Sequence, residues 1–141
     1  MLKINFEEPF NNKKADLFES LTIFTLKKLA PKAYSKITVN FEMIKNFERD
    51  EGLQALMTPD IDKDQYTISI DGGLDMRIAL LAVAHELVHV KQFALGENLD
   101  AEKKRDYFDD PLEIEAYGRE LGLYTRWCEK HGHAKKYKWA K

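Results

Sequence analysis

The sequence predicts a single domain of the α+β class. The chain has 141 residues, the usual size of one domain. Apolar residues recur at helical spacing in three segments, and between the first two of these segments they alternate with polar residues, as they do in strands. The predicted order is helix, three strands, helix, loop and helix, which is typical of a small sheet covered by helices.

The first four elements are predicted from short-range patterns. A helix is expected over residues 13–30, because apolar residues recur there every three or four positions and Pro31 follows. Strands are expected over residues 37–43, 53–57 and 66–70, where apolar and polar residues alternate or a short apolar run lies between turns. The sequence therefore predicts a three-stranded sheet.

Two more helices are expected in the second half of the chain. The segment 74–95 is apolar enough to form a largely buried helix, and Gly96 follows it. A charged loop is expected over residues 98–109. The last helix begins at Pro111, with Asp110 as N-cap and Glu113 in the position of a capping-box acid, and it extends to about residue 130.

Composition limits the environment of the protein. Apolar residues make up 44% of the chain and charged residues 33%, which suits a folded core with a well-solvated surface. The longest apolar run, residues 78–84, is too short to cross a membrane, and no signal-peptide pattern is present. The single cysteine, Cys128, cannot form an internal disulfide. We therefore expect a cytoplasmic protein with no membrane partner.

A metal-binding motif lies in the middle of the helix at 74–95. His85-Glu86-Leu87-Val88-His89 places two histidines four residues apart, so that both project from one face of a helix and can share a metal ion. Glu86, beside them, can take a proton from a metal-bound water. This pattern is typical of zinc-dependent metallopeptidases.

The third metal ligand is less obvious. His131, His133 and downstream carboxylates are the candidates. Gln92 and Leu95 stand where a metzincin requires glycine and histidine, so that class is excluded.

Two glutamates of the last helix are the acidic candidates for this ligand. Glu113 and Glu115 point about 200° apart and cannot both face one ion. Glu113 is expected to act as a capping residue, whereas Glu115 shares a face with Gly118 and Gly122, which would let two helices approach closely. This reasoning predicts Glu115 as the ligand.

These residues resemble a known family. The sequence from His85 to Gln92, followed by Pro111-Leu-Glu-Ile-Glu-Ala-Tyr-Gly-Arg-Glu120, is similar to minimal gluzincin metallopeptidases, particularly the small SprT-like proteins of bacteria and their phages. The resemblance implies a zincin-like fold and the cytoplasm of a bacterium or a phage-infected host. It also implies that the glutamate immediately before alanine, Glu115, is the third Zn²⁺ ligand.

The resemblance also bears on partners. It implies that the third strand, residues 65–71, is the sheet edge against which a protein or peptide substrate lies. Larger SprT-like proteins carry a basic DNA-binding extension, and here only the segment 131–141, with four lysines, Tyr137 and Trp139, could contact nucleic acid. Such a terminus is more often a solvated end.

Several residues keep more than one interpretation. Tyr107, Tyr117 and Tyr124 could each supply a hydroxyl that stabilises an oxyanion, although aromatic residues at helical spacing are usually core. Gln92 could support His89 or be polar surface. The apolar row that begins at Ile78 and continues with Leu81 and Ala82 is expected in the core.

The sequence thus predicts a zincin-like domain over residues 1–130 and a basic tail over 131–141. His85, His89 and Glu115 would bind Zn²⁺, and Glu86 would act as general base in peptide hydrolysis. The alternatives are a zinc-stabilised binding or regulatory module without turnover, and hydrolysis of a non-peptide amide. Neither the substrate nor the oligomeric state follows from the sequence.

Overall fold

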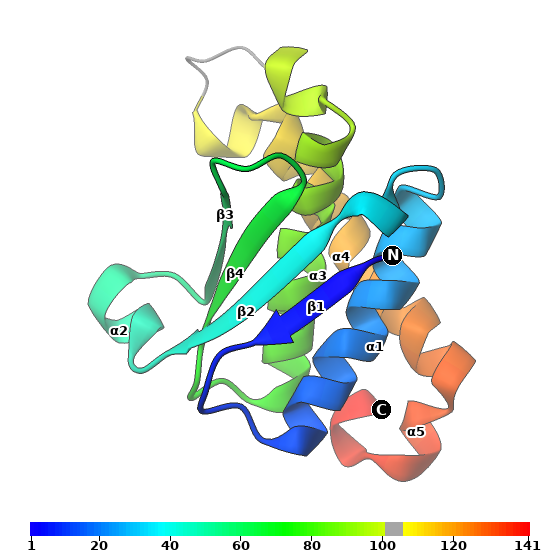
Figure 1. Cartoon of the computed structure of the whole chain (residues 1–141). Coiled ribbons are helices and arrows are strands. Elements are labelled where there is room, and N and C mark those ends of the chain that lie inside the picture. The colour runs from blue at the N-terminus through cyan, green and yellow to red at the C-terminus, as the bar shows by residue number, and fades with distance from the viewer. Residues whose placement is uncertain (101–105) are drawn as a thin grey trace.

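Four strands form one mixed sheet in the computed structural model, which describes residues 1–100 and 106–141 (Figure 1). The strands are β1 (Lys3–Phe6), β2 (Thr38–Ile44), β3 (Ala55–Pro59) and β4 (Gln65–Asp71). The α-helices are α1 (Asn12–Leu29), α2 (Phe47–Glu51), α3 (Met76–Ala94), α4 (Pro111–His131) and α5 (His133–Lys136). Within the two described stretches, no helix combines the length and apolar character needed to cross a membrane. The α+β class is confirmed.

The sheet has one more strand than predicted. Its order is β1-β2-β4-β3, with β1, β2 and β4 parallel and β3 antiparallel to β4. The expectation of three strands is wrong because β1 has only four residues, too few to show a clear alternation. The expected place of the third strand is wrong as well. That strand is β4, which lies inside the sheet, and β3 forms the edge.

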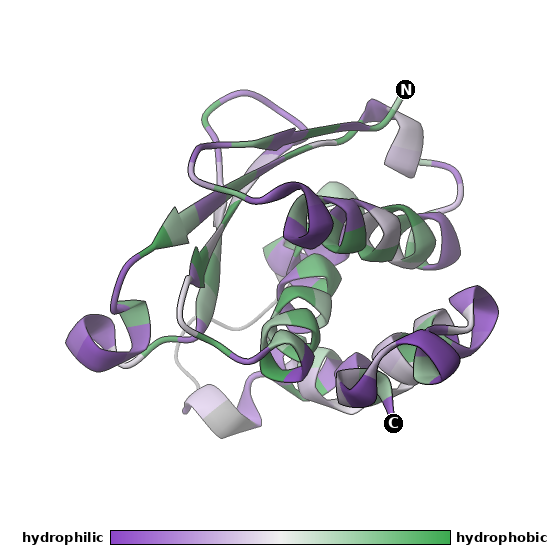
Figure 2. Cartoon of the chain, turned by 90° about the horizontal axis from the view of Figure 1, so that it is seen from below, coloured by the Kyte–Doolittle hydropathy of each residue, from purple (hydrophilic) through white to green (hydrophobic). Residues whose placement is uncertain are grey.

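The helices cover one face of the sheet. Figures 1 and 2 show α1 and α3 side by side beneath this face, with α4 packed on the far side of α3. Phe18 of α1 packs against Phe41 of β2 between the two layers, and both side chains are fully buried. On the opposite face, polar side chains pair across strands, as Asn5 does with Asn40. One buried face and one polar face explain the alternation in the sequence.

The long helices begin and end within two residues of their predicted bounds. The Asn11 side chain accepts a hydrogen bond from the amide of Lys14 and starts α1, and Asp110 does the same for the amide of Leu112 in α4. The segment between β2 and β3 contains the short helix α2, which ends at Gly52 with a positive φ of 72°. Local sequence signals thus fix the helices that carry the candidate site.

The α3 and α4 helices pack against each other in opposite directions. The N-terminal part of α4 lies beside the C-terminal part of α3, and Arg77, near the start of α3, lies over the ring of Tyr124 further along α4. Gly118 and Gly122 do not form the expected close contact, because a Cβ atom at either position would meet nothing within 4 Å. Both glycines lie on the exposed side of α4.

The C-terminal segment is packed against the domain rather than extended. The Trp139 ring stacks near Trp127, with ring centroids 6.4 Å apart, and the Tyr124 hydroxyl donates a hydrogen bond to the carbonyl oxygen of Trp139. The expected boundary after residue 130 falls inside the last turn of α4. The interpretation of residues 131–141 as a solvated tail is therefore wrong, because its aromatic residues bury surface against α4.

His133 occupies an aromatic site in this segment. Its ring lies 4.4 Å from the Trp127 ring and is buried, and neither ring nitrogen has a hydrogen-bond partner among the described residues. Burial, together with the positive charges of His131 and Lys136, lowers the pKa of His133 below its ordinary value. These surroundings favour the neutral form of the imidazole.

We expect the His133→Phe variant to be more stable than the wild-type protein. Replacing the unpaired imidazole by an apolar ring should raise the free energy of unfolding by about 1 kcal/mol at neutral pH. As the pH falls below about 6.5, the unfolded wild-type chain takes up a proton at residue 133 before the folded chain does, so the advantage of the variant should grow. Urea unfolding of both proteins at about pH 7 and about pH 5 measures this difference. A constant or shrinking difference would contradict the assignment.

Candidate metal centre

The buried helix α3 presents His85 and Glu86 to a cleft, and His89 lies one turn further along the same helix. All three residues are buried, and the His85 and His89 rings lie one turn apart with centroids separated by 5.0 Å. The cleft has a volume of about 690 Å³ and is bounded by α3, α4, the Tyr107 segment and the start of β3. The predicted spacing of the two histidines therefore produces a shared site.

Glu113 of α4 completes this site. Its Oε1 atom lies 3.0 Å from Nε2 of His85 and 3.2 Å from Nε2 of His89. Ligand atoms of these three residues all lie within 4.8 Å of one another, and among the described residues this is the one such group of histidines, cysteines or carboxylates. Two imidazoles and one carboxylate are a donor set that suits zinc and leaves a coordination position open.

Glu115, the predicted ligand, faces another way. Its carboxylate accepts hydrogen bonds from Lys91 Nζ at 2.6 Å, Gln92 Nε2 at 2.9 Å and Arg119 Nε at 2.8 Å. Although burial would raise it, these partners hold the pKa of Glu115 at about 2. The prediction of Glu115 beside the histidines is therefore wrong.

Glu113 is not the capping residue that was expected, because the amide it would bind has another partner. In a capping box the glutamate accepts from the amide of the N-cap residue. Here the Asp110 amide donates instead to the carbonyl oxygen of Tyr107, in the short turn before α4. Glu113 is consequently free to reach α3. The glutamate beside the histidines is therefore Glu113, whereas Glu115, on the same helix, pairs with Lys91 and Arg119.

The Nδ1 atom of each histidine, which faces away from Glu113, lies close to a side-chain oxygen. Nδ1 of His85 lies 3.1 Å from a carboxylate oxygen of Glu120, and Nδ1 of His89 lies 2.8 Å from Oε1 of Gln92. These oxygens are acceptors, so each ring donates from Nδ1. In the neutral rings, both Nε2 atoms then turn lone pairs toward the Glu113 carboxylate, which is also an acceptor. Three acceptors directed at one point require protons or a cation between them.

Glu86 is held against the sheet edge. Its Oε1 atom accepts a hydrogen bond of 2.8 Å from the backbone amide of Met57 in β3, while Oε2 lies 3.9 Å from Nε2 of His85. Burial raises the pKa of Glu86 above its ordinary value. The side chain is therefore fixed between the histidines and the strand, in a place where it can accept a proton from a group in the cleft.

Of the three tyrosines considered, two line the cleft. The Tyr117 ring packs on His85 with centroids 4.5 Å apart, and the hydroxyls of Tyr107 and Tyr117 lie 3.0 Å from each other. Tyr124 is buried against Trp127 instead, which removes it from the site. Ile78, expected in the core, is 38% exposed and lines the cleft.

Three residues of the site were not assigned a definite role from the sequence. Lys91, Gln92 and Glu120 each touch a histidine or Glu115. Of these, Gln92 is fully buried, so the interpretation as polar surface is wrong. The position of Gln92 one turn after His89 was the available signal; Glu120 lies too far along the chain for spacing to indicate its contact.

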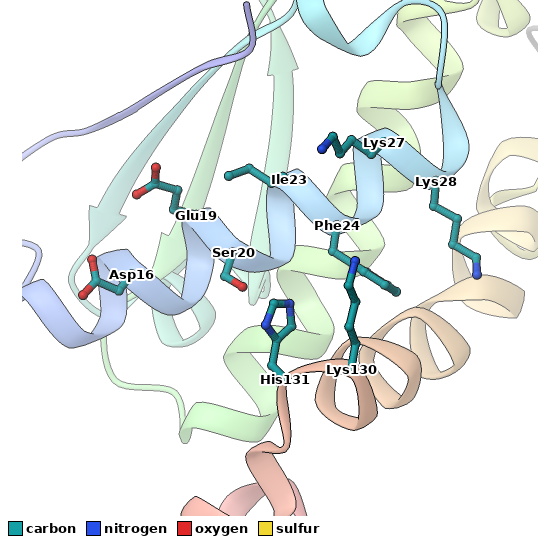
Figure 3. Close-up of a pocket in the computed structure, with 9 residues that line it drawn as sticks. All are labelled: Asp16, Glu19, Ser20, Ile23, Phe24, Lys27, Lys28, Lys130 and His131. Carbon is teal, nitrogen blue, oxygen red and sulfur yellow. The ribbon is translucent and has the colours of Figure 1, made fainter.

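A second hollow lies between α1 and α4 (Figure 3). It has a volume of about 560 Å³ and is lined by Phe24, Lys27, Lys28 and Lys130, with Asp16 and Glu19 at the other end. The side chains around it are mostly exposed, and none of its residues belongs to the His85–His89–Glu113 group. The cleft on α3 is therefore the candidate functional site.

Comparisons with known proteins do not add to this description. No protein-family model, curated protein or solved structure matches the chain. The interpretation of the site therefore depends on its geometry and on the motif that forms it.

Proposed function

We propose that this protein is a zinc-dependent metallopeptidase with a zincin-like fold, in which His85, His89 and Glu113 hold the metal. The observation that carries the proposal is the convergence of two imidazole nitrogens and one carboxylate on a single point. Zinc bound there would polarise a carbonyl group and lower the pKa of a water ligand to about 7.

The roles of the other residues follow from their positions. Glu86 would accept a proton from the attacking water and deliver it to the leaving amine, because its carboxylate is fixed beside the metal ligands and Oε2 is free of the Met57 bond. Glu120 would keep the His85 ring oriented. The hydroxyls of Tyr107 and Tyr117 reach the same cleft and are the nearest candidates to donate to an oxyanion.

A peptide would lie along β3. At one end of β3 the Asp60 amide donates to the carbonyl oxygen of Gln65, and at the other end the carbonyl oxygen of Gln54 accepts from the Asp71 amide. Because the backbone groups of a strand alternate in direction, Ala55, Met57 and Pro59 turn theirs away from β4. Of these, the Met57 amide is taken by Glu86 and Pro59 has no amide hydrogen. Ala55 is thus the residue of β3 with both outward groups available to a substrate strand.

The test combines metal content with turnover. Purified protein would be dialysed, analysed for metal by elemental mass spectrometry, and incubated with an unstructured protein substrate such as casein. We expect about one zinc per chain, and cleavage that is lost with a chelator and restored by zinc. One zinc per chain without cleavage of any peptide in a diverse library would favour the zinc-stabilised binding module. No zinc after reconstitution would overturn the proposal.

A further inference from the structure

The amide of Gln92 can adopt only one orientation. Its Nε2 atom donates to the carbonyl oxygen of Leu112 at 2.8 Å and to Oε1 of Glu115 at 2.9 Å. Both partners are acceptors without hydrogen to give, so the nitrogen of the amide must face them. The oxygen of the amide then faces Nδ1 of His89, 2.8 Å away.

This orientation places a requirement on His89. An amide oxygen cannot donate, so the contact with Gln92 requires a hydrogen on Nδ1. Nε2 lies 3.2 Å from the Glu113 carboxylate, and in a neutral ring that donates to Gln92 it keeps a lone pair directed at the site. We infer that Gln92 is a positioning residue, fixed by Leu112 and Glu115, that holds His89 in the Nδ1-protonated tautomer. The consequence for catalysis rests on the proposed function, because only then is His89 a metal ligand.

Glu115 has a definite part in this arrangement. Lys91, which is buried, and Arg119 both bind Oε2 of Glu115, and this leaves Oε1 for Gln92. Lys91 is also held by Glu97 at 2.9 Å. These side chains form a charged cluster, which consists of Lys91, Glu97, Glu115 and Arg119. The cluster fixes the Glu115 oxygen that accepts from Gln92, and Gln92 in turn contacts His89. This gives a reason for a glutamate at position 115 that does not involve metal binding.

The two histidines are supported in different ways. The Nδ1 atom of His85 binds the carboxylate of Glu120, whereas the Nδ1 atom of His89 binds the neutral, buried amide of Gln92. A carboxylate partner makes an imidazole a stronger ligand, and a neutral partner mainly fixes its orientation. We therefore expect replacement of Gln92 to change the tautomer of His89 and leave that of His85 unchanged.

Nuclear magnetic resonance of the metal-free protein tests this directly. Long-range correlations between ring hydrogens and ring nitrogens report which nitrogen of each histidine is protonated, at a pH where the rings are neutral. In the wild-type protein His89 should be protonated on Nδ1. In Gln92→Leu, or in the milder Gln92→Met, the Nε2-protonated form should appear. Glu97→Gln is the control, because Glu97 belongs to the same charged cluster without touching Gln92.

Zinc affinity provides the second readout. Competition with a chromophoric chelator should show affinity lower by about 10- to 100-fold in Gln92→Leu and unchanged in Glu97→Gln. If the Gln92 variants leave the tautomer of His89 unchanged, the inference is overturned. Wild-type His89 protonated on Nε2 would overturn it even if no variant folds. If the tautomers behave as expected and the wild type binds no zinc, the proposed function fails while the inference stands.

Discussion

The Glu86→Gln variant should bind zinc as the wild type does and lose at least about a hundred-fold of its peptidase activity, the usual contribution of a general base. The substitution removes the proton acceptor but keeps an oxygen that can bind the Met57 amide, so the carboxamide should occupy the same place against β3. Turnover of a fluorogenic peptide at saturating zinc, measured beside metal content, separates the two effects.

Glu48→Gln is the matched control for this variant. Glu48 lines the same cleft, is exposed, and has no place in the proposed machinery, so the same change of charge should leave turnover within about two-fold. Equal activity of Glu86→Gln and wild type would remove Glu86 from the reaction. Equal losses in both variants would indicate that the charge of the cleft, rather than a proton acceptor, is what matters.

Substitutions of two neighbouring glutamates should differ strongly in their effect on zinc affinity. Glu113→Gln removes the carboxylate that lies 3.0 Å from His85, and we expect its zinc affinity to fall by more than about a hundred-fold, beyond the effect usual for residues that only support a ligand. Glu115→Gln makes the same chemical change two residues away. Its side-chain oxygen can still accept from Gln92, so the variant should keep about one zinc per chain.

The folded state of both variants would be checked by thermal unfolding before affinities are compared. Glu115→Gln should lower the midpoint more than Glu113→Gln does, because it weakens ion pairs with Lys91, whose ammonium group is buried. Loss of zinc from Glu115→Gln with retention in Glu113→Gln would restore the assignment made from the sequence and reject the one made from the geometry.

The two histidines of the site could be predicted from the sequence, whereas the choice between Glu113 and Glu115 could not. The spacing of His85 and His89 depends only on the pitch of one helix, so their shared face was predictable. The choice of a third ligand depends on how α4 rotates against α3, and on whether a backbone partner satisfies the Asp110 amide. Neither is visible in the sequence, because both follow from tertiary packing.

The sheet shows the same limit. The positions of β2 and β4 could be predicted from alternation, and that of β3 from a short apolar run, all within two residues. Their spatial order could not be predicted, because β4 follows β3 in the chain but lies between β2 and β3 in the sheet. The C-terminal segment differs from its prediction for another reason. Charged chain ends are usually solvated, whereas here Trp139 and His133 pack their rings against Trp127. Aromatic packing outweighed the local excess of charge.

The edge strand β3 also bears on how the protein behaves at high concentration. An open strand edge is a template on which a second chain can pair and start aggregation. In β3, the Met57 amide is bound to Glu86, and Pro59 has no amide hydrogen. Few outward backbone groups therefore remain for pairing with a second chain. The contact that holds Glu86 in place for its proposed role therefore also disfavours the pairing of two copies edge to edge.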